Sequence, residues 1–308
     1  MLSLPKRITR SINVHRSKLS VFCDWLEATV LFKNEDYSQT DVIDFLLEQQ
    51  KYESQDFCEQ FVTSAWREVR RRMRWLETHS PIEFRDRRVI RKLSWQEQPA
   101  HAFCLLLGLK PYYSDWNDKF GDNHLEQGLL FEKVVEQSLD AIFQDWTVVR
   151  TGWSTDEPTK IDEVVSQLAS DVVEDEGNIK KYAGKNANEE GLDAYWYFRF
   201  NDERGGYPVF LAQCASGDDW KDKLHTPNLS VWAKLVDWKS PPARAFAMPF
   251  ALEDGEFSDQ CNRFSGLFLD RYRILQASKN NKNWLEDKLA KELVAWLDPR
   301  IHWVANLD

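Results

Sequence analysis

Two apolar, aromatic-rich segments of the chain carry one acidic and one amide side chain at corresponding positions. Asp193 begins the segment 193–200, and Gln213 stands near the end of the segment 207–214. The connection between them, residues 201–206, is polar and ends in two glycines, which is typical of a turn that joins antiparallel strands. A turn centred in this connection places Asp193 almost opposite Gln213.

Carboxylate and amide oxygens at the end of a strand are the ligands that a hard divalent cation such as Mg²⁺, or Mn²⁺, prefers. Asp193 and Gln213 therefore predict a site that binds such a cation through oxygen. Two other interpretations remain open. Asp193 can instead solvate the turn, and Gln213 can form a hydrogen bond across the sheet without binding metal.

The elements around the hairpin follow a definite order. Residues 154–191 are set aside as an insertion, with a helix expected at Ile161–Val173 and a charged stretch after it. Without the insertion, the periodicity of the apolar residues predicts a helix, three strands, a second helix and a fourth strand. These elements are expected at His124–Ile142, Trp146–Arg150, Asp193–Phe200, Tyr207–Cys214, Gly217–Val236 and Ala243–Ala251.

This order resembles the core of the PD-(D/E)xK, or restriction-endonuclease-like, nuclease superfamily. In that core the second strand opens with a metal-binding Asp and the third carries (D/E)-x-K. Asp193 corresponds to the Asp, Gln213 to the (D/E) position and Ala215 to the lysine. The resemblance implies a mixed sheet flanked by helices and Mg²⁺- or Mn²⁺-dependent cleavage of DNA, with Asp193 and Gln213 as metal ligands. Because Ala215 lacks an ammonium group, catalytic competence stays open.

Two further side chains are candidates for this site. Lys221, on the expected helix after Ser216 and Gly217, is preferred over Lys223 for orienting the attacking water. Glu132 shares one helical face with apolar neighbours, and the first helix of the resembled fold often contributes a Glu. The alternatives are a lysine on a solvated helix face and a boundary Glu whose head group reaches water.

Residues 1–115 are expected to form a helical domain, with a long helix at Phe57–Leu76. The stretch from Arg67 to Lys92 holds ten basic and four acidic residues. Helices with several arginines bind phosphates without reading sequence, so we predict contacts with nucleic acid. The alternative is a solvated and partly neutralised helix face. The candidate nucleic-acid-binding residues are Arg67, Arg70, Arg71, Arg74, Arg88 and Arg91.

Composition restricts the class of protein. Of the 308 residues, 43% are hydrophobic and 29% are charged, so the chain is expected to fold. No apolar run reaches the ~20 residues of a membrane helix. The five scattered cysteines are expected to stay reduced in a cytoplasm. Neither a Gly-rich phosphate loop nor a GxSxG motif is present, which argues against a P-loop NTPase and an α/β-hydrolase.

The net charge of −10 is unevenly distributed along the chain. Residues 1–120 carry 19 Lys and Arg against 17 Asp and Glu, and the remainder carries 21 against 33. A local basic surface can bind phosphates even on an acidic protein, because salt screens charges beyond about 10 Å at ~0.1 M.

Together these features predict an α+β or α/β protein, with a helical domain over residues 1–115 and a restriction-endonuclease-like α/β domain over residues 116–308. The predicted function is Mg²⁺-dependent DNA cleavage by a cytoplasmic bacterial protein, in phage defence or DNA processing. A helicase or other ATPase is the expected protein partner, and no membrane is involved. The alternative is a catalytically inactive nuclease fold that serves as a scaffold in a defence complex. A helical adaptor, the third interpretation, requires that residues 193–214 form no hairpin.

Overall fold

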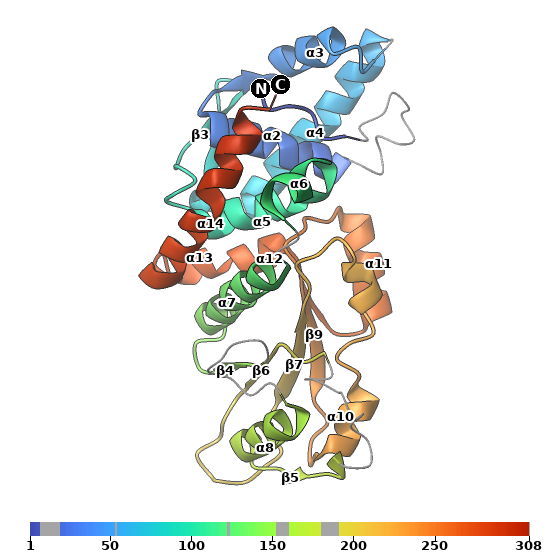
Figure 1. Cartoon of the computed structure of the whole chain (residues 1–308), viewed down its shortest axis with the longest axis vertical. Helices are drawn as coiled ribbons and strands as arrows, with labels where there is room; N and C mark the ends of the chain where they lie inside the picture. Colours follow the sequence, from blue (N-terminus) through green and yellow to red (C-terminus); the bar gives the residue numbers. More distant parts are fainter. Residues whose placement is uncertain (7–18, 53, 122–123, 152–159, 180–190, 308) are drawn as a thin grey trace. The chain divides into compact units, whose positions relative to one another are not determined.

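The computed structural model describes residues 1–6, 19–52, 54–121, 124–151, 160–179 and 191–307 (Figure 1). The chain divides into two units, which are described separately. The first unit comprises residues 1–122, 249–253 and 286–308, and the second comprises residues 123–248 and 254–285. The predicted boundary after residue 115 lies close to the first crossing between the units. The C-terminal helix, in contrast, belongs to the first unit and not to the domain for which it was predicted.

The first unit is mainly helical. Its helices are α2 (Leu19–Lys33), α3 (Gln39–Glu48), α4 (Gln55–Leu76), α5 (Pro99–Leu109), α6 (Trp116–Phe120) and α14 (Asp287–Ala305), with short 3-10 turns η1 (Glu77–His79) and η2 (Lys110–Tyr112). Every residue of α2 from Val21 to Leu31 is buried, and α4, α5 and α14 pack against this helix. Trp296 of α14 meets Phe103 of α5 with ring centroids 5.0 Å apart. This aromatic contact holds the C-terminal helix in the first unit.

The first unit also contains a three-stranded sheet, which the expectation of a purely helical region did not include. Its strands are β1 (Tyr37–Ser38), β2 (Ile82–Arg85) and β3 (Arg88–Arg91), in the order β1-β3-β2. Pro81 cannot continue a helix, and the residues after it alternate between apolar and polar with the period of a strand. The two turn residues, Asp86 and Arg87, have φ angles of 48° and 67°, which close the hairpin.

A buried ion cluster lies within the first unit. The side chain of Arg72 is fully buried and donates hydrogen bonds to Asp24 at 2.8 Å, Glu27 at 3.0 Å and Glu68 at 3.0 Å. A guanidinium group has five N–H donors in a fixed fork, so one arginine can serve three carboxylates. Part of the basic run that the sequence shows is therefore internal and already neutralised.

The second unit is built on a five-stranded sheet in the order β10-β9-β7-β6-β4. The strands are β4 (Thr147–Arg150), β6 (Ala194–Tyr197), β7 (Val209–Cys214), β9 (Ala243–Ala247) and β10 (Leu267–Leu269). Strand β6 pairs antiparallel with β4 and β7, whereas β9 runs parallel to β7 and β10. A mixed sheet flanked by helices is the fold class that the sequence predicts.

Helices cover both faces of this sheet (Figure 1). Helix α8 (Ile161–Val172) packs in one apolar cluster with Tyr195 and Leu211. Trp196 and Phe210 point to the other face, because side chains alternate along a strand, and their rings stack with centroids 5.0 Å apart. Helix α7 (His124–Ile142) lies on that face, and Phe143 just after it approaches Trp196 at 5.8 Å.

The helix expected at Gly217–Val236 is two shorter elements, the 3-10 helix η3 (Trp220–Lys223) and helix α10 (Leu229–Leu235). Pro227 lacks an N–H donor and separates them. The remaining elements of this unit are α11 (Asp254–Phe264), α12 (Arg271–Leu275), α13 (Ala277–Asn280) and the paired strands β5 (Asp175–Glu176) and β8 (Val236–Asp237). Of the predicted insertion, residues 154–159 and 180–190 lie outside the described residues. In the described part of the chain, no helix combines the length and apolarity needed to span a membrane.

Candidate active site

The structure confirms the predicted hairpin, which consists of β6 and β7. Asp193 and Gln213 are in contact at one end of it. The strand register pairs Ala194 with Ala212. Asp193, just before Ala194, therefore faces Gln213, just after Ala212. The backbone N–H of Asp193 donates to the carbonyl of Ala212 at 2.9 Å, which extends the pairing to this position. The two side chains therefore lie side by side at the point where β6 begins and β7 ends.

Two N–H groups hold the carboxylate of Asp193. Its Oδ2 atom accepts a hydrogen bond from the backbone N–H of Cys214 at 2.6 Å and another from the side-chain amide of Gln213. The carbonyl of Asp193 accepts from the backbone N–H of Thr151 at 2.9 Å, which ties the residue to the end of β4. Asp193 is only 5% exposed, and these donors offset the cost of burying a charge.

Gln213 directs its amide nitrogen at Asp193 and its amide oxygen at Thr226. The distance from Thr226 Oγ1 to Gln213 Oε1 is 2.9 Å. The same hydroxyl lies 2.7 Å from the carbonyl oxygen of Lys223, so its single proton serves one acceptor at a time. In this orientation Gln213 forms the cross-strand hydrogen bond that the sequence left open as an alternative to metal binding.

Gly191 provides space for this arrangement. Its φ angle of 70° is in the left-handed region that favours glycine. A Cβ atom at this position would lie 2.9 Å from Gln213 Oε1 and 2.7 Å from Thr226 Cβ. The glycine two residues before Asp193 therefore allows the backbone to approach the site closely, a role that sequence reasoning missed.

A cavity of about 730 Å³ opens over this pair and collects further polar side chains. Helix α7 contributes His124, Gly128 and Glu132, which recur every four residues and so share one helical face. Glu132 is 7% exposed. The cavity is lined by His124, Leu125, Gly128, Leu129, Glu132, Asp193, Gln213, Cys214, Ser216, Gly217, Asp218, Asp219, Lys223, His225 and Thr226.

Cys214 lines this cavity, but its thiol is not suited to nucleophilic chemistry. Burial raises the pKa of its thiol well above the usual value, and the negative charges of Asp193 and Glu132 raise it further. The thiol therefore stays protonated. The positive charge of Arg150 acts on the same sulfur in the opposite direction.

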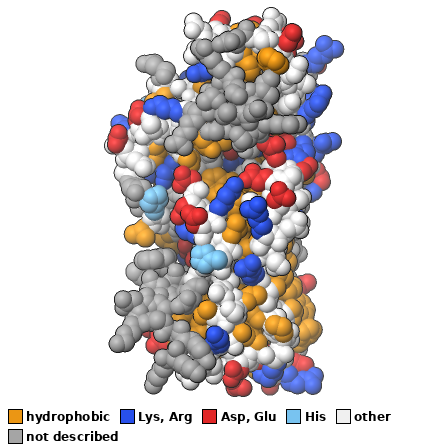
Figure 2. All heavy atoms as spheres, turned by 90° about the vertical axis from the view of Figure 1, so that its right-hand side faces the viewer, with side chains coloured by type: hydrophobic (Ala, Val, Ile, Leu, Met, Phe, Trp, Pro, Cys, Tyr) orange, Lys and Arg blue, Asp and Glu red, His pale blue; other side chains and the backbone are white. Residues whose placement is uncertain are grey.

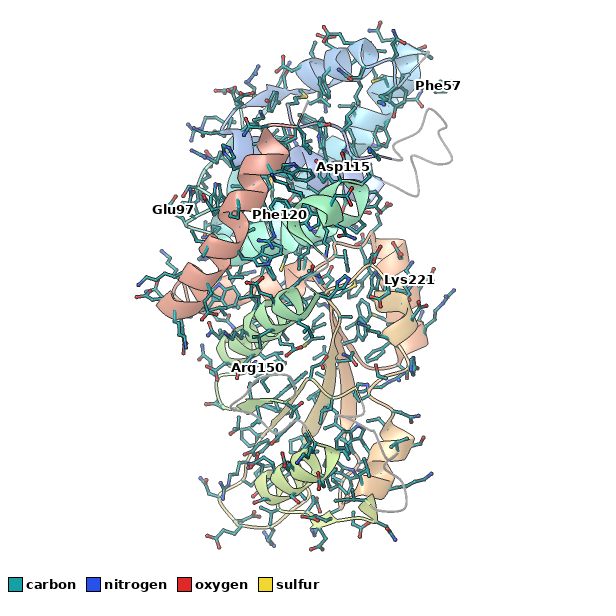
Figure 3. The ribbon with its side chains drawn as sticks, viewed as in Figure 1. Phe57, Glu97, Asp115, Phe120, Arg150 and Lys221 are labelled. Atoms are coloured by element: carbon teal, nitrogen blue, oxygen red, sulfur yellow. The ribbon has the colours of Figure 1, made fainter. Side chains whose placement is uncertain are left out.

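The structure separates the two candidate lysines. Lys223 lines the cavity, 3.8 Å from Asp219 Oδ2. Lys221 is not among the described residues that line it: its side chain is 55% exposed and pairs with Glu256 of α11 at 2.8 Å (Figure 3). A 3-10 helix turns by about 120° per residue, so side chains two positions apart point to different sides. Ala215, which corresponds to the lysine in the resemblance to the nuclease superfamily, is buried, and its backbone N–H donates to the carbonyl of Ala247 at 2.9 Å.

The donor set suits a hard cation in type but is small in number. Among the residues that the structure describes, no group of three or more His, Cys, Asp and Glu side chains is arranged to hold a metal ion. Asp193, Gln213 and Glu132 offer oxygen ligands, and Mg²⁺ commonly keeps several waters beside one or two carboxylates. Rotation of the Gln213 amide by half a turn would bring its oxygen to the side of Asp193.

The arginines predicted to bind nucleic acid have different surroundings. Arg71 pairs with Glu68 at 2.8 Å, and Arg88 pairs with Asp41 at 2.8 Å and also with Asp36. Arg91 ends β3. The other three, Arg67, Arg70 and Arg74, are exposed on α4. Charges of both signs are intermixed on the face drawn in Figure 2. The ion pairs of each arginine, and not the number of basic residues in the segment, therefore indicate which arginines could bind a phosphate.

Comparisons with known proteins leave the function open. No protein-family model and no curated protein matches the chain. A crystal structure of protein VC1899 from Vibrio cholerae aligns over 92% of this chain and 58% of that chain, with 9% identity and a TM-score of 0.19. The chain thus spans less than two thirds of that protein, and a similarity this low carries no argument about fold or function.

Proposed function

We propose that the second unit is a Mg²⁺- or Mn²⁺-dependent nuclease that hydrolyses DNA phosphodiester bonds. The observation that carries the proposal is the contact between Asp193 and Gln213 at adjacent strand ends, inside a cavity that also holds Glu132 and Lys223. The order α7, β4, β6, β7, α10 and β9 is the helix, three strands, helix and strand on which the resemblance to this superfamily rests. That order supports the proposal through fold alone.

In this proposal Asp193 and Gln213 hold the cation through oxygen, with Glu132 assisting from α7. A bound Mg²⁺ would polarise the scissile phosphate and lower the pKa of an attacking water. Asp193 is already positioned by its backbone contacts to β4 and β7. Gln213 must turn its oxygen away from Thr226, which then accepts a hydrogen bond from the amide nitrogen.

Lys223 takes the role that the sequence assigned to Lys221. Its ammonium group would orient the attacking water and offset the negative charge that develops on the phosphate. Lys221 is engaged with Glu256 outside the cavity lining, so we expect it to contribute little to the reaction.

A second candidate function is a nuclease-like fold without activity, which acts as a scaffold. Asp193 accepts two N–H hydrogen bonds, and Gln213 adds no charge for a cation. Ala215 also lacks the usual ammonium group. These three features together describe a pair, Asp193 and Gln213, that is hydrogen-bonded without metal.

Partners remain part of the proposal. A nuclease of this kind is expected to act in a bacterial cytoplasm beside a helicase or other ATPase, in phage defence or DNA processing. The scaffold alternative predicts the same partners without DNA cleavage, so activity separates the two.

Cleavage of supercoiled plasmid by the full chain tests the proposal, with Mg²⁺, with Mn²⁺ and with EDTA. We expect metal-dependent nicking that Asp193→Ala abolishes and that Lys223→Ala lowers on the order of 10²-fold. Lys221→Ala is the matched control and is expected to stay within about twofold of the parent chain. Absence of nicking under all metal conditions, also with an ATPase partner added, would favour the scaffold.

A further inference from the structure

Three arginines form one exposed face of helix α4 in the first unit. Arg67, Arg70 and Arg74 line a hollow of about 540 Å³ together with Met73, Glu77 and Phe84. A spacing of three and four residues places the arginines on one side of the helix, and a rise of 1.5 Å per residue spreads them over about 10 Å. We call this surface the arginine face.

These arginines differ from their neighbours on the same helix because no carboxylate of the described residues forms an ion pair with them. Arg71 and Arg72 are bound to Glu68 at 2.8 and 3.0 Å. Among the described residues that line the arginine face, three guanidinium groups stand against one carboxylate, that of Glu77, a net charge of +2. The arginine face therefore attracts an anionic ligand of about its own length.

An aromatic ring lies within the arginine face. The guanidinium of Arg70 is 4.3 Å from the centroid of the Phe84 ring, and both side chains border the hollow. Phe84 is half-buried and is supported from below by Trp66, with ring centroids 6.2 Å apart. A fixed ring beside several cations is the combination that stacks a base while its flanking phosphates are neutralised.

We propose that the arginine face binds single-stranded nucleic acid, with Arg67 and Arg74 on phosphates and a base stacked on the guanidinium of Arg70, which lies over the Phe84 ring. An unpaired base can stack on the guanidinium plane of Arg70, which Phe84 supports, whereas a base in a duplex is already stacked on its neighbours. Arg71, Arg88 and Arg91, which the sequence also indicated, are not part of this surface. The proposal does not depend on hydrolysis in the second unit.

Fluorescence anisotropy of a labelled 20-nucleotide oligo-dT with the full chain tests the proposal in EDTA, where metal-dependent cleavage cannot occur. The test variant is Arg67→Ala/Arg70→Ala/Arg74→Ala. The matched control removes three exposed positive charges from the second unit, as Lys160→Ala/Arg199→Ala/Arg204→Ala. We expect the test variant alone to bind at least about tenfold more weakly, and its slope of log K against log salt to be smaller by about 1.4, because two phosphate contacts to a single strand are lost.

Phe84 separates base stacking from plain charge attraction. Phe84→Ala and Phe84→Leu should each weaken oligo-dT binding by about fivefold or more without changing the salt slope. Phe84→Leu keeps an apolar side chain over Trp66, and its melting temperature verifies that the unit is folded. Both Phe84 variants should leave the affinity for heparin, a polyanion without bases, unchanged.

Three outcomes would overturn the proposal. The first is a dissociation constant above about 100 µM for oligo-dT and the parent chain at low salt. The second is an equal loss of affinity in the test and control triple variants, which would mean that only the total charge matters. The third is a loss of heparin binding in the Phe84 variants as large as the loss for oligo-dT, which would make the surface a general polyanion site.

Discussion

Gln213 points its amide nitrogen, and not its amide oxygen, at the carboxylate of Asp193. This hydrogen bond connects the ends of β6 and β7 and satisfies both side chains without a cation. Metal binding by the pair therefore requires a half turn of the amide, with Thr226 exchanging its role from donor to acceptor. The energetic competition between this internal hydrogen bond and an oxygen-bound cation decides whether the site is active.

Gln213→Glu should convert the site into one whose stability depends on divalent cations. Without metal, the variant loses the N–H donor and places a second carboxylate against Asp193, which we expect to cost about 1–3 kcal/mol. With Mg²⁺, the two carboxylates become better ligands than the natural pair, so the melting temperature should rise with Mg²⁺ more than in the parent chain. Thermal unfolding with and without Mg²⁺ measures both effects.

Gln127→Glu is the matched control for this change. Gln127 donates its side-chain amide to the carbonyl of Ser216 at 3.0 Å, is 2% exposed, and lies outside the cavity lining. The Gln127→Glu variant should have a lower melting temperature than the parent chain, and Mg²⁺ should not raise it. An equal response of the two variants to Mg²⁺ would contradict a metal site at Asp193 and Gln213.

Gly191→Ala should damage the site, whereas Gly121→Ala should act only through the backbone. Both glycines have positive φ, 70° and 69°, and Gly121, with ψ 176°, lies in a region that is nearly exclusive to glycine, so both substitutions add backbone strain of about 1–3 kcal/mol. Only at Gly191 would the new methyl group meet Gln213 and Thr226, since nothing lies within 4 Å of the corresponding position at Gly121. Chemical denaturation should show an additional loss of about 1 kcal/mol or more for Gly191→Ala. Equal losses would mean that Gln213 and Thr226 move aside freely.

Gly128→Phe should block the cavity without unfolding the protein. Nothing lies within 4 Å of a Cβ at this helical position, so the side chain can enter the space in front of Glu132. We expect plasmid cleavage to fall at least tenfold while the melting temperature stays within a few degrees. Gly128→Ala, in contrast, should stabilise α7 by roughly 0.5–1 kcal/mol.

Gly255→Phe controls for a large aromatic substitution on a helix, because its Cβ also meets nothing within 4 Å, and α11 is outside the cavity lining. If it lowers cleavage as much as Gly128→Phe, obstruction of the cavity is not the cause.

Arg72→Met should be the most destabilising substitution in the basic run of α4. It leaves the carboxylates of Asp24, Glu27 and Glu68 buried together without the guanidinium, at a cost of about 3–5 kcal/mol. The same substitution at exposed Arg74 should stay within ~0.5 kcal/mol. Denaturant unfolding monitored by tryptophan fluorescence measures the difference, and similar values for the two variants would show that the buried cluster is not important for stability.

Local sequence was sufficient to predict several elements. Helix α7 begins at His124 and ends at Ile142, as its apolar periodicity predicts. Local residues also explain the start of α3, where Ser38 and Asp41 form a capping box: the hydroxyl of Ser38 accepts from the backbone N–H of Asp41, and the carboxylate of Asp41 accepts from that of Ser38. The turn between residues 200 and 207, with its glycines, predicts the hairpin that brings Asp193 to Gln213.

Other features depended on packing at a distance. A run of arginines does not reveal that Arg72 is internal, because the carboxylates of Asp24 and Glu27 that neutralise it come from another helix. Nor does the amphipathic C-terminal segment reveal its partner, since Trp296 would suit any apolar surface until Phe103 provides one. The short sheet that contains Phe84 was missed because the expected helical pattern around it hid an alternation of only a few residues.

The sequence by itself determined which residues could do chemistry and which strands would present them. Periodicity, helix caps and turn residues act over a few positions of the chain, so they can be recognised in the sequence alone. Only the tertiary structure decided that Lys223 and not Lys221 lines the cavity, and that the oxygen of Gln213 faces Thr226. Those outcomes depend on where Pro227 breaks a helix and on how closely Gly191 lets the backbone approach, and such contacts join residues that no local pattern connects.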